Sequence, residues 1–83
     1  MLFLGIMYYL GNGVPEDFGR AAFWYRKAAA GGNPDAMYNL GRMYENGKGV
    51  ERDLKQAAEL YGKAAGRGNA EAKIALARLA PSP

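Results

Sequence analysis

Residues 40–75 read LGRMYENGKGVERDLKQAAELYGKAAGRGNAEAKIA and repeat the pattern of residues 4–39, LGIMYYLGNGVPEDFGRAAFWYRKAAAGGNPDAMYN. Aligned without a gap, the two stretches share 17 of 36 positions, and a third copy starts at Leu76. A period of roughly 20 to 50 residues is typical of architectures in which each unit buries its apolar face against a neighbour. The repeat therefore predicts a stack of similar units.

Each unit reads as two helices joined by glycine turns. Asp17 and Asp53, and likewise Asn33 and Asn69, are placed to accept an unpaired amide at the start of a helix. Gln56 follows Asp53 at the spacing of a capping box. With the glycine turns as stops, the sequence predicts five helices over about residues 2–10, 18–30, 34–46, 54–66 and 70–79, the last ended by Pro81 and Pro83.

Gly5 and Gly41 lie at equivalent positions in the middle of predicted helices. Glycine costs about 1 kcal/mol relative to alanine there. Because the cost recurs, we expect an adjacent helix to approach too closely for a Cβ. The paired alanines of each unit indicate similarly close helix crossings.

The chain is short enough to form one small domain of 83 residues. We divide it into an incomplete repeat (1–33), a repeat (34–69), a partial repeat (70–80) and a tail (81–83). The abundance of alanine and the absence of long Val/Ile runs favour an all-α fold.

The 11 basic and 8 acidic residues give a formal net charge of +3. The basic residues are spread along the chain, and their longest run is Arg26-Lys27, which indicates charged helix surfaces and no nucleic-acid-binding face. The apolar N-terminus lacks a basic leader and a cleavage site, and it is too short to cross a bilayer. We therefore expect no membrane insertion, and a cytoplasmic location is favoured.

Reactive side chains are scarce. The chain has no His, Cys or Thr, and its one serine, Ser82, lies in the tail. This excludes Ser–His and Cys–His sites, thiolate metal sites and disulfides. The acidic residues near Asp17 and Asp53 lie at loop ends, where these aspartates serve as caps. The sequence therefore predicts no catalytic residue, no metal site and no cofactor.

The glycine turns do not indicate phosphate binding. Gly11-Asn12-Gly13 and Gly47-Lys48-Gly49 follow no strand and extend to no complete nucleotide-binding pattern. Because they recur in register, we interpret them as turns between helices.

The pattern A-x-x-x-L-G-x-M-Y-x-x-G-x-G-V-x-x-D-x-x-x-A-A-x-x-Y-x-K-A-A-x-x-G-N closely resembles the Sel1-like repeat, a relative of the tetratricopeptide repeat. It is complete from Ala36 to Asn69, and it runs from Leu4 to Asn33 without the opening alanine. The resemblance implies an α/α solenoid whose first helices line a concave surface, with adaptor or scaffold roles, mostly in bacteria. It implies no catalytic residue, and the β-lactam activities linked to cysteine-rich members do not carry over to a chain without cysteine.

The predicted binding face consists of first-helix positions that avoid the repeat signature and share one side of each helix. The residues are Leu2, Ile6, Tyr9 and Leu10 in the first unit, Asp35, Tyr38, Arg42, Glu45 and Asn46 in the second, and Glu71, Ile74 and Arg78 in the third.

Two functions fit this face. The first is a non-enzymatic interaction module that binds a protein segment, with the apolar residues as anchors and Arg42, Glu45 and Arg78 orienting the partner. The alternative is a structural segment that self-associates, either as a homo-oligomer through the exposed N-terminal helix or as part of a longer array. An exposed apolar patch such as that of the first unit requires one of these explanations.

Overall fold

The computed structural model describes residues 2–11, 13 and 16–79. These residues form five helices and no strand. The helices are α1 (Leu2–Leu10), α2 (Phe18–Ala30), α3 (Pro34–Asn46), α4 (Leu54–Gly66) and α5 (Ala70–Leu79). The predicted all-α fold with five helices is therefore confirmed over this part of the chain.

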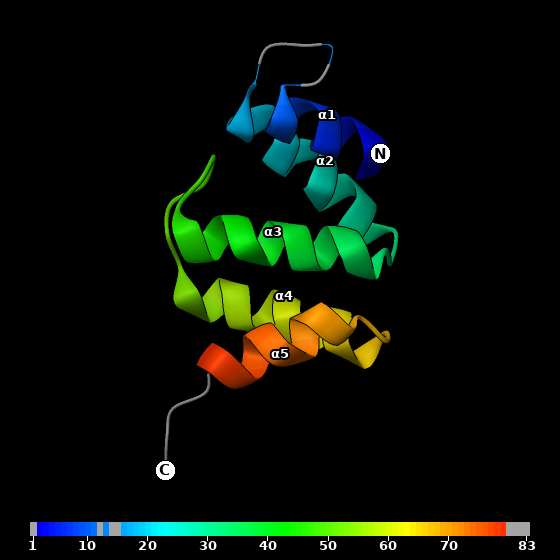
Figure 1. The fold of residues 1–83 in the computed structure, drawn as a ribbon, viewed down its shortest axis with the longest axis vertical. Coiled ribbons are helices and arrows are strands. Elements are labelled where there is room, and N and C mark those ends of the chain that lie inside the picture. Colours follow the sequence, from blue (N-terminus) through cyan, green and yellow to red (C-terminus); the bar gives the residue numbers. More distant parts are fainter. Residues whose placement is uncertain (1, 12, 14–15, 80–83) are drawn as a thin grey trace.

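The helices are piled along one axis in chain order. Each helix packs mainly on the next, and the molecule measures 44 × 23 × 17 Å. Figure 1 shows α1 and α2 at one end, α3 in the middle, and α4 with α5 at the other end. This is the arrangement of an α/α solenoid, in which stability comes from nearest-neighbour contacts.

The helix ends follow the predicted chemistry. Asn33 Oδ1 accepts the amides of Asp35 and Ala36 at the start of α3, and Pro34 occupies the first turn. Gly47 ends α3 with a φ of +67°, a left-handed conformation that side chains disfavour.

The second half of the capping box at α4 was predicted wrongly. Asp53 Oδ1 accepts the amide of Gln56, as the motif requires. The amide of Asp53, however, donates to the carbonyl of Tyr44 at 2.9 Å. In the first unit the amide of Asp17 donates in the same way to the carbonyl of Tyr8 at 2.8 Å. The loop thus folds back on the preceding helix. The Asp53 amide therefore donates to a backbone carbonyl and not to the side chain of Gln56.

The mid-helix glycines are contact points for tyrosine rings. A Cβ on Gly41 would lie 2.8 Å from Tyr61 Cε1, and a Cβ on Gly5 would lie 2.6 Å from the ring of Tyr25. Both distances are shorter than a normal carbon contact. The predicted close approach is confirmed in both units, and it joins the two helices of one hairpin.

The core consists of two buried clusters. One holds Ala21, Ala22, Tyr25, Leu40 and Met43, which come from α2 and α3. The other is built on Tyr61 with residues of α3, α4 and α5. Tyr44 and Leu60 pack against both clusters. The hydrophobic interior is therefore continuous from one repeat to the next.

Some predictions fall on residues that the structure does not describe. The helix terminators Pro81 and Pro83, the tail 81–83 and residue 80 lie outside the described residues, as does Asn12 of the first glycine turn. In the second turn, Gly49 has a φ of +73°, as a helix–helix turn requires.

Candidate functional site

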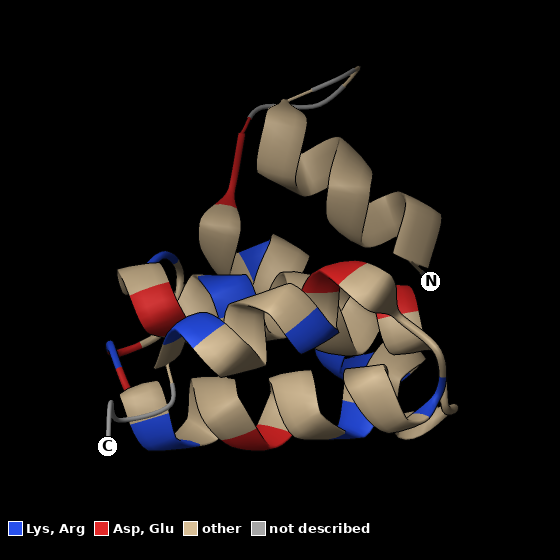
Figure 2. Ribbon diagram, turned by 60° about the horizontal axis from the view of Figure 1, so that its bottom comes forward, with Lys and Arg blue, Asp and Glu red and all other residues tan. Residues whose placement is uncertain are grey.

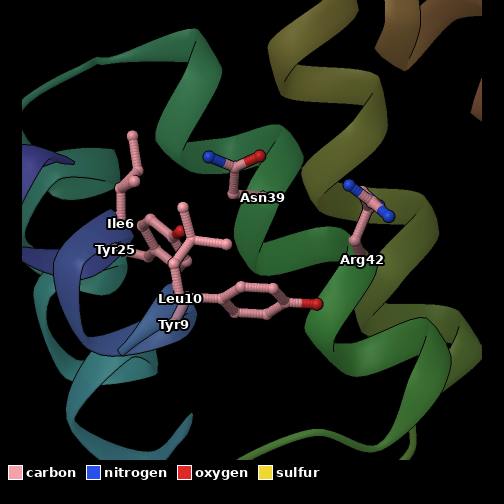
Figure 3. Close-up of a pocket in the computed structure, with 6 residues that line it drawn as sticks. All are labelled: Ile6, Tyr9, Leu10, Tyr25, Asn39 and Arg42. Carbon is pink, nitrogen blue, oxygen red and sulfur yellow. The ribbon is translucent and has the colours of Figure 1, made fainter. Parts of the chain in front are cut away.

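A pocket of about 200 Å³ opens between α1 and α3. Figure 3 shows Tyr9 extending from α1 toward α3, with Ile6 and Leu10 near its base and Asn39 and Arg42 projecting from α3. Its lining residues are Ile6, Tyr9, Leu10, Tyr25, Asn39 and Arg42. Four of the twelve predicted face residues (Ile6, Tyr9, Leu10 and Arg42) are thus brought together here, from two different units.

One wall of the pocket is apolar and the other is polar. Ile6 and Leu10 are one turn apart on α1 and are 36% and 64% exposed. Asn39 and Arg42 lie three residues apart on α3, so they share one face of that helix. The arrangement presents an aliphatic surface beside an amide and a guanidinium.

Arg42 lies over an aromatic ring. Its guanidinium carbon is 5.8 Å from the ring centroid of Tyr38, within the range of a cation–π contact. Within the described residues the structure gives Arg42 no ion pair. Arg42 thus lines the pocket without a direct ion pair to that part of the chain, although its charge also acts on Glu45 one turn along α3.

Glu45 and Arg78 of the predicted face pair with each other. Arg78 Nη2 donates to Glu45 Oε1 at 3.0 Å, while Nη1 donates to Oε2. The hydroxyl of Tyr61 donates to the same Oε1 at 2.7 Å. The hydrogen bonds from Arg78, helped by that from Tyr61, lower the pKa of Glu45 to about 2, although burial opposes the shift. These contacts join α3, α4 and α5.

The phenols behind the face are held neutral. Burial raises the pKa of Tyr61, and the hydrogen bond to Glu45 raises it further. Burial also raises the pKa of Tyr25 to about 12. Both hydroxyls therefore remain hydrogen-bond donors throughout the physiological range.

The remaining predicted residues lie apart from the pocket lining. Leu2 packs against the core cluster of α2 and α3, and the ring of Tyr38 lies against that of Tyr61 with centroids 5.7 Å apart and a tilt of 40°. Asp35 accepts a hydrogen bond from Asn69, and Asn46 donates to the carbonyl of Arg42. Glu71 and Ile74 on α5 are exposed.

Sequence reasoning missed Asn39 and Tyr25 in the pocket and the exposed Phe3. Asn39 and Phe3 occupy the same position of the unit, and the third copy has Ala75 there. The difference between the first two copies was a signal that could have placed Phe3 and Asn39 on the face, whereas Ala75 is buried. Tyr25 matches the repeat signature, which is typical of a core position and gives no sign that the residue also lines a pocket.

The charges show no large region of one sign. Figure 2 shows basic and acidic residues interspersed over the helices, while the helix beside the N-terminal mark, α1, carries neither. Among the described residues no cluster of three acidic side chains is placed to hold a metal ion. In that same part of the chain, the helices are all too short or too polar to span a bilayer.

The fold and the face define a class: short helix hairpins that repeat and stack into an α/α solenoid. The Sel1 repeat model matches residues 1–33 and 34–69, so the chain belongs to the Sel1 repeat family. Proteins of this family generally act as protein-interaction scaffolds and are generally non-enzymatic.

Solved structures of Sel1-type proteins are close in shape and sequence. A Sel1 repeat protein from Oxalobacter formigenes superposes with a TM-score of 0.91 at 47% identity, over 93% of this chain and 58% of that one. A protective antigen present in uropathogenic Escherichia coli strains, described as displaying an SLR fold, gives 0.86 at 40% identity, over 87% and 15%. Helicobacter pylori cysteine rich protein B gives 0.85 at 36% identity, over 89% and 56%.

These relatives are bacterial and longer than this chain. It spans 58%, 15% and 56% of their lengths. The Helicobacter protein is cysteine-rich by name, whereas this chain has no cysteine. No match was found among curated proteins.

Proposed function

We propose that this chain is a non-enzymatic interaction module that binds a segment of another protein across α1, α3 and α5. The pocket between α1 and α3 is the observation that carries this proposal. It joins exposed aliphatic side chains of one unit to Arg42 of the next, which makes no ion pair with a described residue, so a bound segment would contact consecutive repeats. We also infer one Sel1-like repeat domain over residues 1–83 and a cytoplasmic location.

The surface is suited to a short segment. A pocket of about 200 Å³ accommodates one or two side chains, and binding through so small an area is weak unless neighbouring repeats extend it. Ile74 on α5, 71% exposed, offers a further apolar contact along the same predicted face. Tyr38 contributes to the binding face indirectly, because its ring packs under the Arg42 guanidinium.

Affinity purification with the intact chain tests the proposal. Arg42→Ala should lose the partner proteins that the wild-type chain captures. Lys55→Ala is the control, because Lys55 is exposed on α4 outside the predicted face. Equal recovery by all three proteins would show that the pocket is not the binding site.

The apolar end of the molecule supports the alternative, a structural segment that self-associates. Phe3 on α1 and Phe23 on α2 are 72% and 47% exposed, and α1 has no charged residue. Unpaired apolar surface of this kind favours association. Sedimentation measurements on the wild-type chain and on Phe3→Ser decide this alternative: it requires a concentration-dependent dimer that the substitution weakens, and a monomer at all concentrations refutes it.

The proposal assigns no chemistry to the site. With no His, Cys or Thr in the chain, a Ser–His or Cys–His pair of nucleophile and base is excluded. A substrate screen for hydrolase activity should show no turnover that follows the protein through purification, and turnover that does so would contradict a purely binding role.

A further inference from the structure

Because the units repeat, the side chains where the second unit meets the third can be compared with those where the first unit meets the second. Tyr61, Glu45 and Arg78 form a hydrogen-bonded group where the second unit meets the third. The positions 36 residues earlier hold Tyr25, Tyr9 and Arg42. The tyrosine and the arginine recur, but a tyrosine stands where the carboxylate would be.

The first junction thus keeps both donors and lacks their acceptor. Arg78 donates two hydrogen bonds to Glu45, whereas Arg42 makes no ion pair with any residue that the structure describes. The Tyr61 hydroxyl donates to Glu45, whereas no hydrogen bond joins the Tyr25 hydroxyl to the described part of the chain. The ring of Tyr9 packs beside Phe18, with centroids 5.1 Å apart.

The two donors are open to a ligand from the pocket beside Tyr9. Tyr25 and Arg42 both line the pocket between α1 and α3. Tyr25 is only 3% exposed. Among the described residues, however, no side-chain nitrogen or oxygen is both fully buried and without a hydrogen-bond partner. The Tyr25 hydroxyl is therefore reached through the pocket, next to the aliphatic wall of Ile6 and Leu10.

We propose that this pocket receives a glutamate side chain from a partner protein, which binds the equivalents of the two donors that hold Glu45 at the next junction. The carboxylate is held by Arg42 and Tyr25, with the Asn39 amide beside it, and an apolar residue flanking the glutamate packs on Ile6 and Leu10. The charge complementarity is argued from the chain itself, because the equivalent donors Arg78 and Tyr61 bind Glu45 one repeat later. This inference rests on the proposed protein-binding function and names the chemistry of the partner.

Supplying the missing carboxylate within the chain is the first test. In Tyr9→Glu, the new carboxyl should form the equivalent of the Glu45 group, and NMR titration should find its pKa at least one unit below the ordinary glutamate value of about 4.3. Tyr9→Gln is the matched control for the lost ring, and the charged variant should unfold at higher denaturant than this control at pH 7. A titration at the ordinary value, from folded protein, would overturn the proposal.

Lys48 must be separated from Arg42 in this test. Its Nζ lies 5.7 Å from the Tyr9 ring centroid, so it could also lower the pKa of a carboxyl at that position. Arg42→Gln combined with Tyr9→Glu should return the pKa to its ordinary range. A pKa that stays low in the double variant would assign the effect to Lys48 and overturn the role of Arg42.

Binding by the wild-type chain is the second test. The probes are acetyl-Leu-Glu-Leu-amide and its glutamine counterpart, followed by chemical shifts of the Asn39 amide and Arg42 side chain. The glutamate peptide should bind at least about tenfold more tightly, which corresponds to about 1.4 kcal/mol, and the preference should disappear in Tyr9→Glu. Equal binding of the two peptides, or none by the glutamate peptide, would overturn the carboxylate site.

A third peptide separates the two sources of a carboxylate. Acetyl-Leu-Gln-Leu with a free C-terminus should bind as weakly as its amide. Tight binding would show that the pocket takes a chain terminus and would overturn the glutamate assignment. If the peptide tests fail but partner capture still depends on Arg42, the proposed protein-binding function stands and only the glutamate site is wrong. If partner capture does not depend on Arg42, the proposed function is wrong as well.

Discussion

Gly41 lowers the helix propensity of α3, and the packing of one neighbour, Tyr61, explains why a glycine is found there. Its missing Cβ leaves room for the ring of Tyr61, which a Cβ would approach to 2.8 Å. Tyr61 is fully buried, so the ring has little room to move away. The helix-propensity cost of glycine is therefore offset by the packing that it permits.

Gly41→Ala should destabilise the protein by about 1–3 kcal/mol, because overpacking outweighs the gain in helix propensity. Gly62→Ala is the matched control: Gly62 is also inside a helix, and a Cβ there would meet nothing within 4 Å. It should stabilise by up to about 1 kcal/mol. Urea unfolding of both variants measures the difference, and two changes of the same sign would contradict the role of Gly41.

Glu45 gives the molecule a defined response to acid. Its pKa falls from 4.5 to about 2 on folding, chiefly through the hydrogen bonds from Arg78. A carboxyl whose pKa is lower in the folded state binds protons more tightly when unfolded, so it stabilises the fold above pH 4.5 and loses that contribution as the pH falls toward 2.

Glu45→Gln should therefore be less stable than the wild-type chain at pH 7, and the gap should narrow between pH 4.5 and 2. Denaturant midpoints across this range test it. A gap that is constant with pH would show that the charge of Glu45 contributes nothing and that only its shape matters.

At the level of the element, α5 depends on Asn69 for its start. Asn69 Oδ1 accepts the amide of Ala72 at 2.7 Å, while Nδ2 donates to Asp35 at 3.0 Å. The residue thus begins one helix and ties it to the start of α3.

Asn69→Ala should cost about 1 kcal/mol, the usual value for the loss of an N-cap. Asn69→Ser keeps a cap acceptor but cannot reach Asp35 with an amide, so it should recover most of the loss. Thermal or urea unfolding compares the three proteins. If the serine variant is as unstable as the alanine variant, the bond to Asp35 carries the effect and the capping account is wrong.

Helix positions could be predicted because their signals are local. Caps such as Asn33 and stops such as Gly47 act within a few residues, and the structure places the helices where these residues indicate. The Asp53 amide could not be predicted, because its acceptor on Tyr44 depends on how the loop folds back. The same applies to the site: the partners Glu45 and Arg78 are 33 residues apart and meet only through packing.

For the whole molecule, the question is whether the repeats act as one unit. Leu60 packs against both buried clusters, so it links α2 and α3 to α4 and α5. A chain of this size is held by about 4–12 kcal/mol in total, so one shared contact is a large share of the stability. We expect the repeats to unfold together.

Leu60→Ala should cost about 2–3 kcal/mol and should lower hydrogen-exchange protection in α2 and α4 by the same free energy. Leu54→Ala is the control, because Leu54 is 43% exposed and belongs to neither cluster; it should cost less than about 1 kcal/mol. Loss of protection confined to α4 would mean that the repeats open independently.

The equivalence of the repeats underlies the fold, the binding face and the glutamate site. A NOESY spectrum of the wild-type chain tests it most directly. It should show contacts from the Hα protons of Gly5 to the Tyr25 ring and from those of Gly41 to the Tyr61 ring, with both glycines shifted by the ring currents. Contacts at Gly41 without their counterpart at Gly5, in folded protein, would contradict the account because the two halves would then fold differently.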